Sequence, residues 1–425
     1  MKVIWLLGMF FVLIFIGLPI IFSMGLLSMA VFVGQGNSML IIGQKLFSSL
    51  DNFTYICIPL FILASEIMTQ CNLMGSLVNV CNAFIGHVKG GLALVNVLGS
   101  MLFAGVSGSA SADTTGLGRV EIEMMKKAGY DPTYATTVTV ASAILGPIIP
   151  PSNAFVIYAA ISGSVSIAAM FLAGIIPGVM LGLTEMALCY YYAVKYNHPV
   201  SPKTTIREKI YAVKEALPIL VLPIIILGGI ISGIFTATES AAVAVVYAIF
   251  IAIVRKKLNL KVLYRCCVRA AKNTASIMMI IAVASLMGYA ITVLRLPQIA
   301  IEWATASIGN QYIFLLFVNV LLLLLGCVLD QTPAMLLVVP ILLPIATKFG
   351  IDPIHFGLIV CFNLTVALIT PPVGMQLFIG ANVGHIKLSS LFRSILPFAG
   401  VALITLFIIT FVPSTSTFLP TFFGY

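Results

Sequence analysis

The chain has 425 residues, of which 61% are hydrophobic and only 8% are charged, with a mean hydropathy of +1.15. Soluble domains carry about 25% charged residues, so this composition excludes a soluble globular protein and indicates an integral membrane protein. The net charge of +9 does not indicate a nucleic-acid partner, because the cations gather at the ends of apolar stretches. We therefore expect an all-α protein whose surroundings are the lipid bilayer.

The first apolar block runs from Val3 to Val33 and is too long for the core of a signal peptide, so we expect a retained helix. Further charge-poor blocks follow, and from their lengths we count roughly ten to twelve crossings of the bilayer. The expected division is 1–87 for scaffold helices, 88–194 for a first repeat with a hairpin and a broken helix, 195–310 for basic surface helices and scaffold helices, 311–388 for a second such repeat, and 389–425 for a C-terminal helix.

Two basic clusters flank one apolar hairpin. Residues 195–214 carry five Lys and Arg residues and residues 255–272 carry seven. Two crossings between the clusters place both on one side of the membrane, and the positive-inside rule makes that side cytoplasmic. We expect the two segments to form amphipathic helices in the headgroup region, where cations are attracted to anionic lipids.

A repeated set of motifs divides the chain into two related halves. GYDPTYA begins at Gly129 and GIDPIHF begins at Gly350, and the Pro-Pro pairs at 150–151 and 371–372 are separated by the same offset of 221. Two motifs that share one offset indicate a duplicated unit. Each unit contains an apolar hairpin with a polar tip, a Gly-x-Asp-Pro loop, an apolar helix, the double proline and a second apolar segment.

The double prolines predict two broken transmembrane helices. Proline lacks an N–H group and its ring blocks the carbonyl one turn back, so each pair interrupts a helix and frees backbone polar groups. Such groups are tolerated at membrane depth only where they are buried in protein or line a cavity. Broken helices at corresponding positions of two halves are typical of the ion and substrate sites of transporters. A simple kink is the alternative, because single prolines are common in membrane helices.

Two polar segments between apolar arms predict re-entrant hairpins. In the first half Gly105–Gly118 is rich in Gly, Ser and Thr, and its arms of about 12 to 15 residues are too short to cross the bilayer. In the second half Leu329–Ala334 follows a long apolar run, and the offset between the repeated motifs sets Asp330 opposite Ser109. Hydroxyl and carbonyl oxygens at such tips are suitable ligands for a hard cation. Close packing of helices is the alternative role for each individual serine.

Other polar residues leave more than one interpretation open. Glu66 lies either at an interface or at a functional site, and Glu239 either contacts a ligand or caps the helix that follows a Thr-rich break, which we favour. The eight cysteines and four histidines show no metal-ligand spacing, so packing or helix-end roles are expected for them. The sequence contains no nucleotide-binding loop and no catalytic constellation, so neither an ATP-driven pump nor an enzyme is indicated.

Five long motifs, in this order and covering most of the chain, carry a family resemblance: GVSGSASADTTGLG, ILGPIIPPSNAF, GIFTATESAAVAVVYA, LDQTPAMLLVVPILLPIA and NLTVALITPPVGMQLFI. Together they resemble the large membrane subunit of tripartite ATP-independent periplasmic (TRAP) transporters. The resemblance implies a multi-pass protein of the bacterial inner membrane with two inverted repeats and an elevator mechanism. It also implies import of an organic acid, delivered by a periplasmic substrate-binding protein. A separate small four-helix membrane subunit is the expected permanent partner.

The resemblance further implies sodium as the coupling ion, bound by oxygens of the hairpin tips and helix breaks. The implied sodium ligands are Ser107, Gly108, Ser109, Pro151, Ser152 and Asn153 in the first half, and Asp330, Thr332, Thr370 and Gly374 in the second. Substrate would lie between the two tips, and the expected contacts are Ser109, Asn153, Asp330 and Gln376. The second break reads PPVG where the first reads PPSN. Backbone carbonyls must therefore supply more of the second set of ligands.

The sequence does not define which acid is imported. Sialic acid is the first hypothesis for the substrate and a C4-dicarboxylate is the next. A symporter that works without a binding protein, or a channel, is the alternative to the tripartite system.

Overall fold

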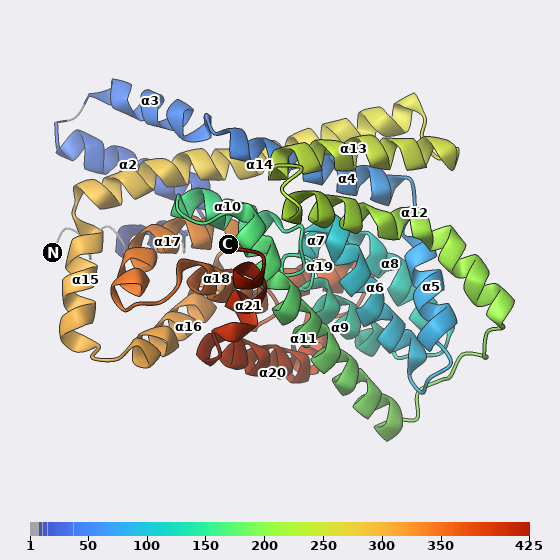
Figure 1. The fold of residues 1–425 in the computed structure, drawn as a ribbon. Helices are drawn as coiled ribbons and strands as arrows, with labels where there is room; N and C mark the ends of the chain where they lie inside the picture. The colour runs from blue at the N-terminus through green and yellow to red at the C-terminus, as the bar shows by residue number, and fades with distance from the viewer. Residues whose placement is uncertain (1–7, 11, 15, 37) are drawn as a thin grey trace.

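The structure of the chain, a computed structural model, describes residues 8–10, 12–14, 16–36 and 38–425, without the side chains of residues 303, 305 and 306. Within these ranges the chain forms helices and no β-strand (Figure 1). The first half contains α2 (Ile20–Gly34), α3 (Met39–Leu50), the 3-10 helix η1 (Phe53–Ile56), α4 (Cys57–Gln70), α5 (Gly75–Ile85), α6 (Gly91–Ser107), α7 (Ala110–Thr115), α8 (Leu117–Lys127), α9 (Pro132–Ala143), α10 (Asn153–Ser162) and α11 (Ile167–Lys195). Then follow α12 (Ile206–Ile231), α13 (Ala237–Val254), α14 (Leu260–Val293), α15 (Leu296–Ser307), α16 (Gln311–Val328), α17 (Gln331–Lys348), α18 (Pro353–Ala367), α19 (Met375–Gly384), α20 (Leu388–Phe411) and α21 (Ser414–Phe422).

Eight helices of the described chain are long and apolar enough to cross a bilayer, and six shorter apolar helices of 10 to 17 residues accompany them. The count of roughly ten to twelve crossings stays a prediction, because two short helices on either side of a Pro-Pro break, such as α9 and α10, can cross the bilayer together. The all-α membrane architecture that the composition predicts is confirmed.

The apolar block from Val3 to Val33 is not one continuous helix. Its first residues, 3–7, lie outside the described part of the chain. Further along, Gly17 has a φ of +95° and Pro19 precedes the first residue of α2. Glycine and proline together end one helical segment and start the next, so the prediction of a single helix is wrong within the described residues.

Helix boundaries in the two halves follow the same offset as the motifs. The arms α6 and α16 are each joined to their successors, α7 and α17, by two-residue connections, which are residues 108–109 and 329–330. The helices α9 and α18 begin at residues 132 and 353, which are also 221 apart. Correspondence extends beyond the hairpins, because α5 and α15 begin at residues 75 and 296.

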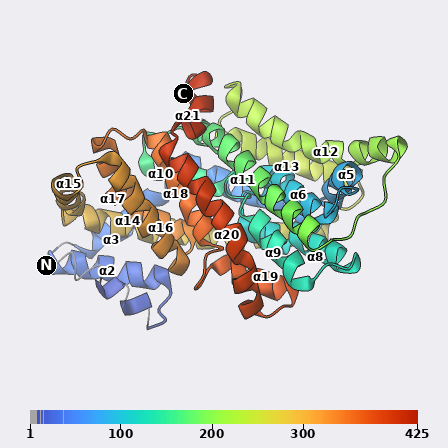
Figure 2. The ribbon, with the colours of Figure 1, turned by 90° about the horizontal axis from the view of Figure 1, so that it is seen from below.

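One pair of threonines lies where the two halves meet. Thr184 of α11 and Thr405 of α20 are separated by 221 residues, and their hydroxyl oxygens are 3.4 Å apart. Figure 2 shows α11 and α20 side by side across the middle of the molecule. A residue that touches its own counterpart is the contact expected on a two-fold axis relating the halves.

The halves differ elsewhere, since the single helix α14 corresponds to the separate helices α3 and α4.

The Gly-x-Asp-Pro motif starts the first part of each broken helix. Gly129 and Gly350 have positive φ values of +89° and +76°, which glycine adopts without strain. The carboxylates of Asp131 and Asp352 accept hydrogen bonds from the N–H groups of Tyr134 and Ile354 at 2.9 and 2.7 Å. Proline in the first turn needs no N–H partner, so both sequences form well-capped helix starts.

The double prolines lie in breaks, as the sequence predicts. The first break spans residues 144–152 between α9 and α10, and the second spans residues 368–374 between α18 and α19. Each helix tightens before its break through bonds to the third preceding residue, such as Leu145 N–H to the Ser142 carbonyl and Ile369 N–H to the Val366 carbonyl. The simple kink is excluded for both pairs, because the helix after each break starts anew.

Each half places its second helix segment against the hairpin of the other half. Figure 1 shows α10 beside α17 and α18, while α19 lies among α7, α8 and α9. The Tyr158 hydroxyl of α10 donates a 2.7 Å hydrogen bond to the Pro353 carbonyl. In return, the Lys126 ammonium of α8 donates one of 2.7 Å to the Gly384 carbonyl at the end of α19. The two halves are therefore interlocked rather than merely adjacent.

The basic segments do not form separate surface helices. Residues 206–214 are the first turns of α12 and residues 260–272 are the first turns of α14, so this prediction is wrong. In α14 no glycine or proline precedes residue 288, and nothing in the sequence stops the basic turns from continuing into the apolar ones. At 34 residues α14 is about 51 Å long, more than the ~30 Å hydrocarbon core.

Both basic segments lie at one end of the molecule, which we call the basic side. The Arg255 guanidinium donates to the Glu215 carbonyl, which brings the end of α13 to the start of α12. The Tyr130 hydroxyl donates a 3.2 Å bond to the Pro199 carbonyl, so the base of the first hairpin is on the basic side too. The positive-inside rule predicts that the basic side is cytoplasmic.

Candidate functional site

The first hairpin tip packs directly on the first helix break. Gly108 has a φ of +61°, and a Cβ at this position would lie 2.7 Å from the Pro151 carbonyl oxygen and 3.4 Å from the Asn153 amide nitrogen. Only glycine permits this approach. Ser109 follows in an extended conformation, and its N–H donates a 3.4 Å hydrogen bond to the Ser107 hydroxyl. The structure thus brings together the residues of the first predicted sodium site.

The end of the arm α16, next to the second hairpin tip, packs on the second break. The Cys327 thiol lies 3.7 Å from the Thr370 carbonyl oxygen. Asp330 precedes α17 in an extended conformation and makes no capping hydrogen bond to that helix. The neighbouring Gln331 amide donates to the Thr365 hydroxyl at 2.8 Å, which fixes the tip against α18.

Gln376 joins the second break to the first tip. Its side chain is 1% exposed, and its amide nitrogen donates a 2.8 Å hydrogen bond to the Ala110 carbonyl and another to the Thr114 hydroxyl. Its amide oxygen accepts a 3.4 Å bond from the Ser111 hydroxyl. The two amide donors are thus used within the protein, so Gln376 holds the site together rather than offering a free amide to a substrate.

The remaining predicted residues divide between structural and available groups. The Ser152 hydroxyl donates to the Pro147 carbonyl and caps α10, and the Thr370 hydroxyl donates to the Val366 carbonyl at 2.9 Å. Both hydroxyls therefore already have partners. The Asn153 and Thr332 side chains are partly buried and make no hydrogen bond to any residue that the structure describes.

The donor chemistry of the two breaks fits a sodium ion. Gly374 has a φ of +53°, and the carbonyl oxygens of Leu368 and Thr370 both lie 3.0 Å from the position of a Cβ there. In the first break the Pro151 carbonyl faces Gly108. Unwound backbone carbonyls of broken helices are the usual ligands for sodium in secondary transporters. Val373 and Gly374 of PPVG carry no side-chain oxygen, so at these positions the second break offers backbone oxygens.

Buried carboxylates near the first hairpin were not singled out by sequence reasoning. Glu121 and Glu185 are fully buried, Asp113 is 2% exposed, and no carboxylate oxygen of the three makes a hydrogen bond within the described residues. Asp113 packs on the first break, where a Cβ at Gly146 would lie 2.5 Å from its Oδ2. Two signals were available in the sequence. Glu185 is the only acidic residue of α11, and Glu121 lies one turn from apolar residues on either side.

A polar cavity of about 390 Å³ opens beside the first hairpin. It lies between α4, the arm formed by α7 and α8, and α14, and its lining includes Glu66, Thr69, Gln70, Thr115, Arg119 and Arg269. Glu66 lines a polar cavity where three helical elements meet. This position is compatible with both interpretations from the sequence, an interface and a functional site.

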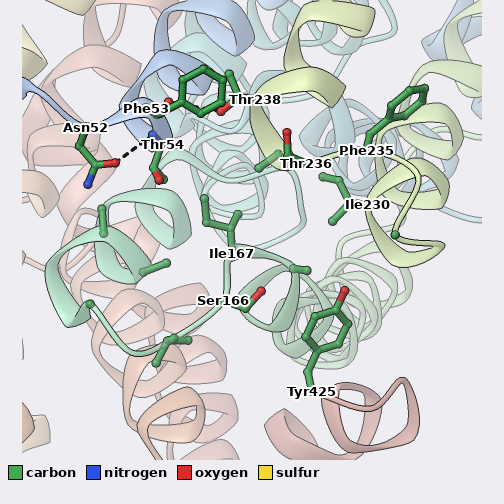
Figure 3. Close-up of a pocket in the computed structure, with 17 residues that line it drawn as sticks. Asn52, Phe53, Thr54, Ser166, Ile167, Ile230, Phe235, Thr236, Thr238 and Tyr425 are labelled. Atoms are coloured by element: carbon green, nitrogen blue, oxygen red, sulfur yellow. Dashed lines mark hydrogen bonds between the residues drawn. The ribbon is translucent and has the colours of Figure 1, made fainter.

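A second cavity of about 560 Å³ lies at the end of α12 opposite the basic side (Figure 3). The labelled residues come from the start of η1 and the residue before it, the start of α11, the end of α12, the turn that leads into α13 and its first residues, and the C-terminal Tyr425. Thr236 and Glu239 form a capping box at the start of α13, so the interpretation of Glu239 as a cap is confirmed. No predicted site residue lines this cavity.

Most of the cysteines and one histidine of the described chain lie in packed positions. All eight cysteines are free thiols, and seven of them are buried. The His355 ring lies 2.7 Å from the Ser416 hydroxyl and 3.3 Å from the Thr410 carbonyl oxygen, which fastens α21 to α18.

Comparison with known proteins decides the family. The family model described as "Tripartite ATP-independent periplasmic transporter, DctM component" matches residues 7–415 of the chain. The chain belongs to this family. It is a TRAP transporter large permease, a protein of the bacterial inner membrane and not an enzyme.

Two curated relatives and one solved structure illustrate the likeness. The TRAP permease is 36% identical to the sialic acid TRAP transporter large permease protein SiaM of Vibrio cholerae, over 97% of each chain. It is 38% identical to the C4-dicarboxylate TRAP transporter large permease protein DctM of Pseudomonas aeruginosa, over 89% of each chain. The YdaH transporter of Alcanivorax borkumensis shares the fold, with a TM-score of 0.64 and 13% identity over 87% of this chain and 86% of that one.

Proposed function

We propose that this TRAP permease couples the import of an organic acid to the entry of sodium. The observation that carries the proposal is the packing of each oxygen-rich hairpin tip on a Pro-Pro break, with Gly108 against the Pro151 carbonyl and Cys327 against the Thr370 carbonyl. Carbonyl oxygens gathered at two related breaks suit a monovalent cation. Bound sodium and the N-terminal ends of α10 and α17 would provide the positive field that a carboxylate needs.

The acid that we propose first is a sialic acid, and the next candidate is a C4-dicarboxylate. Relatives named for these two substrates match the chain at 36% and 38% identity. Overall similarity therefore does not separate the two candidates. The substrate contacts that we propose are Ser109, Asn153 and Asp330, whereas Gln376 acts by holding the first tip against the second break.

Two partners complete the proposed transporter, a small four-helix membrane subunit and a periplasmic substrate-binding protein. In an elevator mechanism the hairpins and broken helices would move together past the outer helices. The elevator mechanism is supported by the packing of α10 against α17 and of α19 against α7. Because each broken helix packs on the hairpin of the other half, the two hairpins and the two broken helices can only move as one body.

The test is uptake by proteoliposomes that contain both membrane subunits. Radiolabelled N-acetylneuraminate or succinate is supplied with its binding protein, with and without an inward sodium gradient. We expect uphill, electrogenic accumulation that needs sodium, the small subunit and the binding protein. Uptake that persists without the binding protein would favour a simple symporter, and downhill flux without sodium dependence would favour a channel. Either result would refute the proposal.

A further inference from the structure

The polar cavity beside the first hairpin is connected to the proposed substrate site by a stripe of three polar side chains on α7 and α8. Ser111, Thr115 and Arg119 are exposed and follow one another at intervals of four residues along α7 and α8. Gly116 separates α7 from α8, so contacts rather than spacing link the three residues. The Thr115 hydroxyl donates a 2.8 Å hydrogen bond to the Ser111 carbonyl, and Thr115 and Arg119 line the same cavity. At one end of the stripe Ser111 donates to Gln376, and at the other end Thr115 and Arg119 line the cavity.

The opposite wall of the cavity lies near the basic side. Gln70 is the last residue of α4, and two residues later the Asn72 carbonyl accepts a 3.0 Å hydrogen bond from the Lys257 ammonium. Arg269 belongs to the basic first turns of α14. The stripe therefore leads from the hairpin tip toward the side that is predicted to be cytoplasmic.

The charges in the cavity are unequal. Glu66 interacts electrostatically with Arg269 and hydrogen-bonds Gln70, although its Oε2 makes no hydrogen bond. Arg119 has no hydrogen-bond or ion-pair partner among the residues that the structure describes. Arg119 thus faces the cavity without an ion-pair partner among the described residues, in a lining that carries two cations and one carboxylate. A guanidinium in this position is well suited to a carboxylate, which it can bind through two parallel hydrogen bonds.

The second half provides an internal comparison. At the offset that relates the two halves, the counterparts of Glu66, Thr115 and Arg119 are Met287, Leu336 and Pro340. There α17 packs against α14, and Met287 and Leu336 are buried in the core. In the first half no comparable packing joins α7 or α8 to α4. The fold does not require polar residues at these positions, so their presence on one side alone points to a function.

We propose that this cavity is the site through which the anionic substrate leaves toward the basic side, with Arg119 receiving its carboxylate. The inference rests on the proposed function of the permease. Arg269 adds positive charge and Glu66 opposes tight binding, because an exit site must hold an anion weakly enough to release it. No sodium ligand of the hairpin tips belongs to this cavity.

The charge and the opening of the cavity are tested without any substrate. Thr115 is changed to Cys in a Cys267→Ser background, since Cys267 is the one exposed cysteine. Anionic and cationic methanethiosulfonate reagents are applied to inside-out and right-side-out vesicles. We expect reaction in inside-out vesicles only, faster with the anion, and a fall of about fivefold in the anion-to-cation rate ratio when Arg119→Gln is added. Reaction from the opposite side, or an unchanged ratio, would overturn the inference.

Transport by the complete complex gives the second measurement. Arg119→Gln should slow uptake of N-acetylneuraminate or succinate, whichever the wild type imports, by about three- to tenfold. Lys127→Gln on α8 and Arg265→Gln on α14 remove the same charge outside the cavity and should leave uptake within about 1.5-fold of wild type. If Arg119→Gln is as active as these controls, the exit site is wrong although the transport proposal stands. If the wild type imports neither acid, the transport proposal fails and the exit role with it.

Discussion

Replacement of Gln376 by Met tests whether the bond between the two halves sets the sodium site. The change keeps the length of the side chain but removes hydrogen bonds to the Ala110 carbonyl, the Thr114 hydroxyl and the Ser111 hydroxyl. Each buried hydrogen bond contributes about 0.5–1.5 kcal/mol, and the 3.4 Å bond to Ser111 is the weakest, so we expect a loss of about 2 kcal/mol. The first tip should then shift from the second break. A loss of about 1.4 kcal/mol in binding free energy weakens affinity tenfold. We therefore expect the sodium concentration for half-maximal uptake to rise at least about threefold.

A matched control removes buried hydrogen bonds far from the tips. Asn319 donates a 3.0 Å bond to the Thr410 hydroxyl and accepts a 2.7 Å bond from the Asn363 amide, all within the second half. Asn319→Leu should therefore lower stability by a similar ~2 kcal/mol and leave the sodium dependence unchanged. Unfolding can be followed with a thiol-reactive dye, because seven of the eight cysteines are buried. If Gln376→Met and Asn319→Leu show the same sodium dependence, the hydrogen bonds of Gln376 do not set the sodium site.

Three further predictions concern separate elements. Asp330→Asn keeps the shape of the second tip but removes its charge, so sodium-driven uptake should fall at least about tenfold with assembly intact; wild-type uptake and sodium dependence would assign Asp330 a structural role. Gly146→Ala should reduce the yield of folded protein and its thermal stability, because the new Cβ would lie 2.5 Å from an Asp113 oxygen. Gly228→Ala, with nothing within 4 Å, is its control. Thr236→Ala removes one half of a capping box and should cost about 1 kcal/mol of stability without changing sodium dependence, as measured by thermal unfolding and uptake.

Local patterns in the sequence predicted the elements that depend on local chemistry. The double prolines end helices because of their own geometry, and Asp131 and Asp352 cap the helices directly after them. The constant offset between the repeated motifs predicted the alignment of the two tips, and both tips are two-residue connections at that offset. The cap role of Glu239 followed from the threonine three residues earlier.

Features that depend on distant contacts were not predictable in the same way. The role of Gln376 rests on a residue 266 positions away, which no local pattern records. The arm α6 has 17 residues and is longer than the sequence predicts, because the helix continues through Gly105 to Ser107, which look like part of the polar tip. Glu121 and Glu123 look alike in sequence, yet only Glu121 is buried, since it shares a helix face with Leu117.

The interlocked halves set the order in which this protein can be made. Ala110 leaves the ribosome 266 residues before its hydrogen-bond partner Gln376. At about 5–20 residues per second, synthesis of the intervening chain takes roughly 13–53 s. During that time the polar face of α7 has no protein partner from α19, and it must remain near the translocation channel or water rather than enter lipid. Insertion of the first hairpin is therefore finished only after most of the second half has been translated.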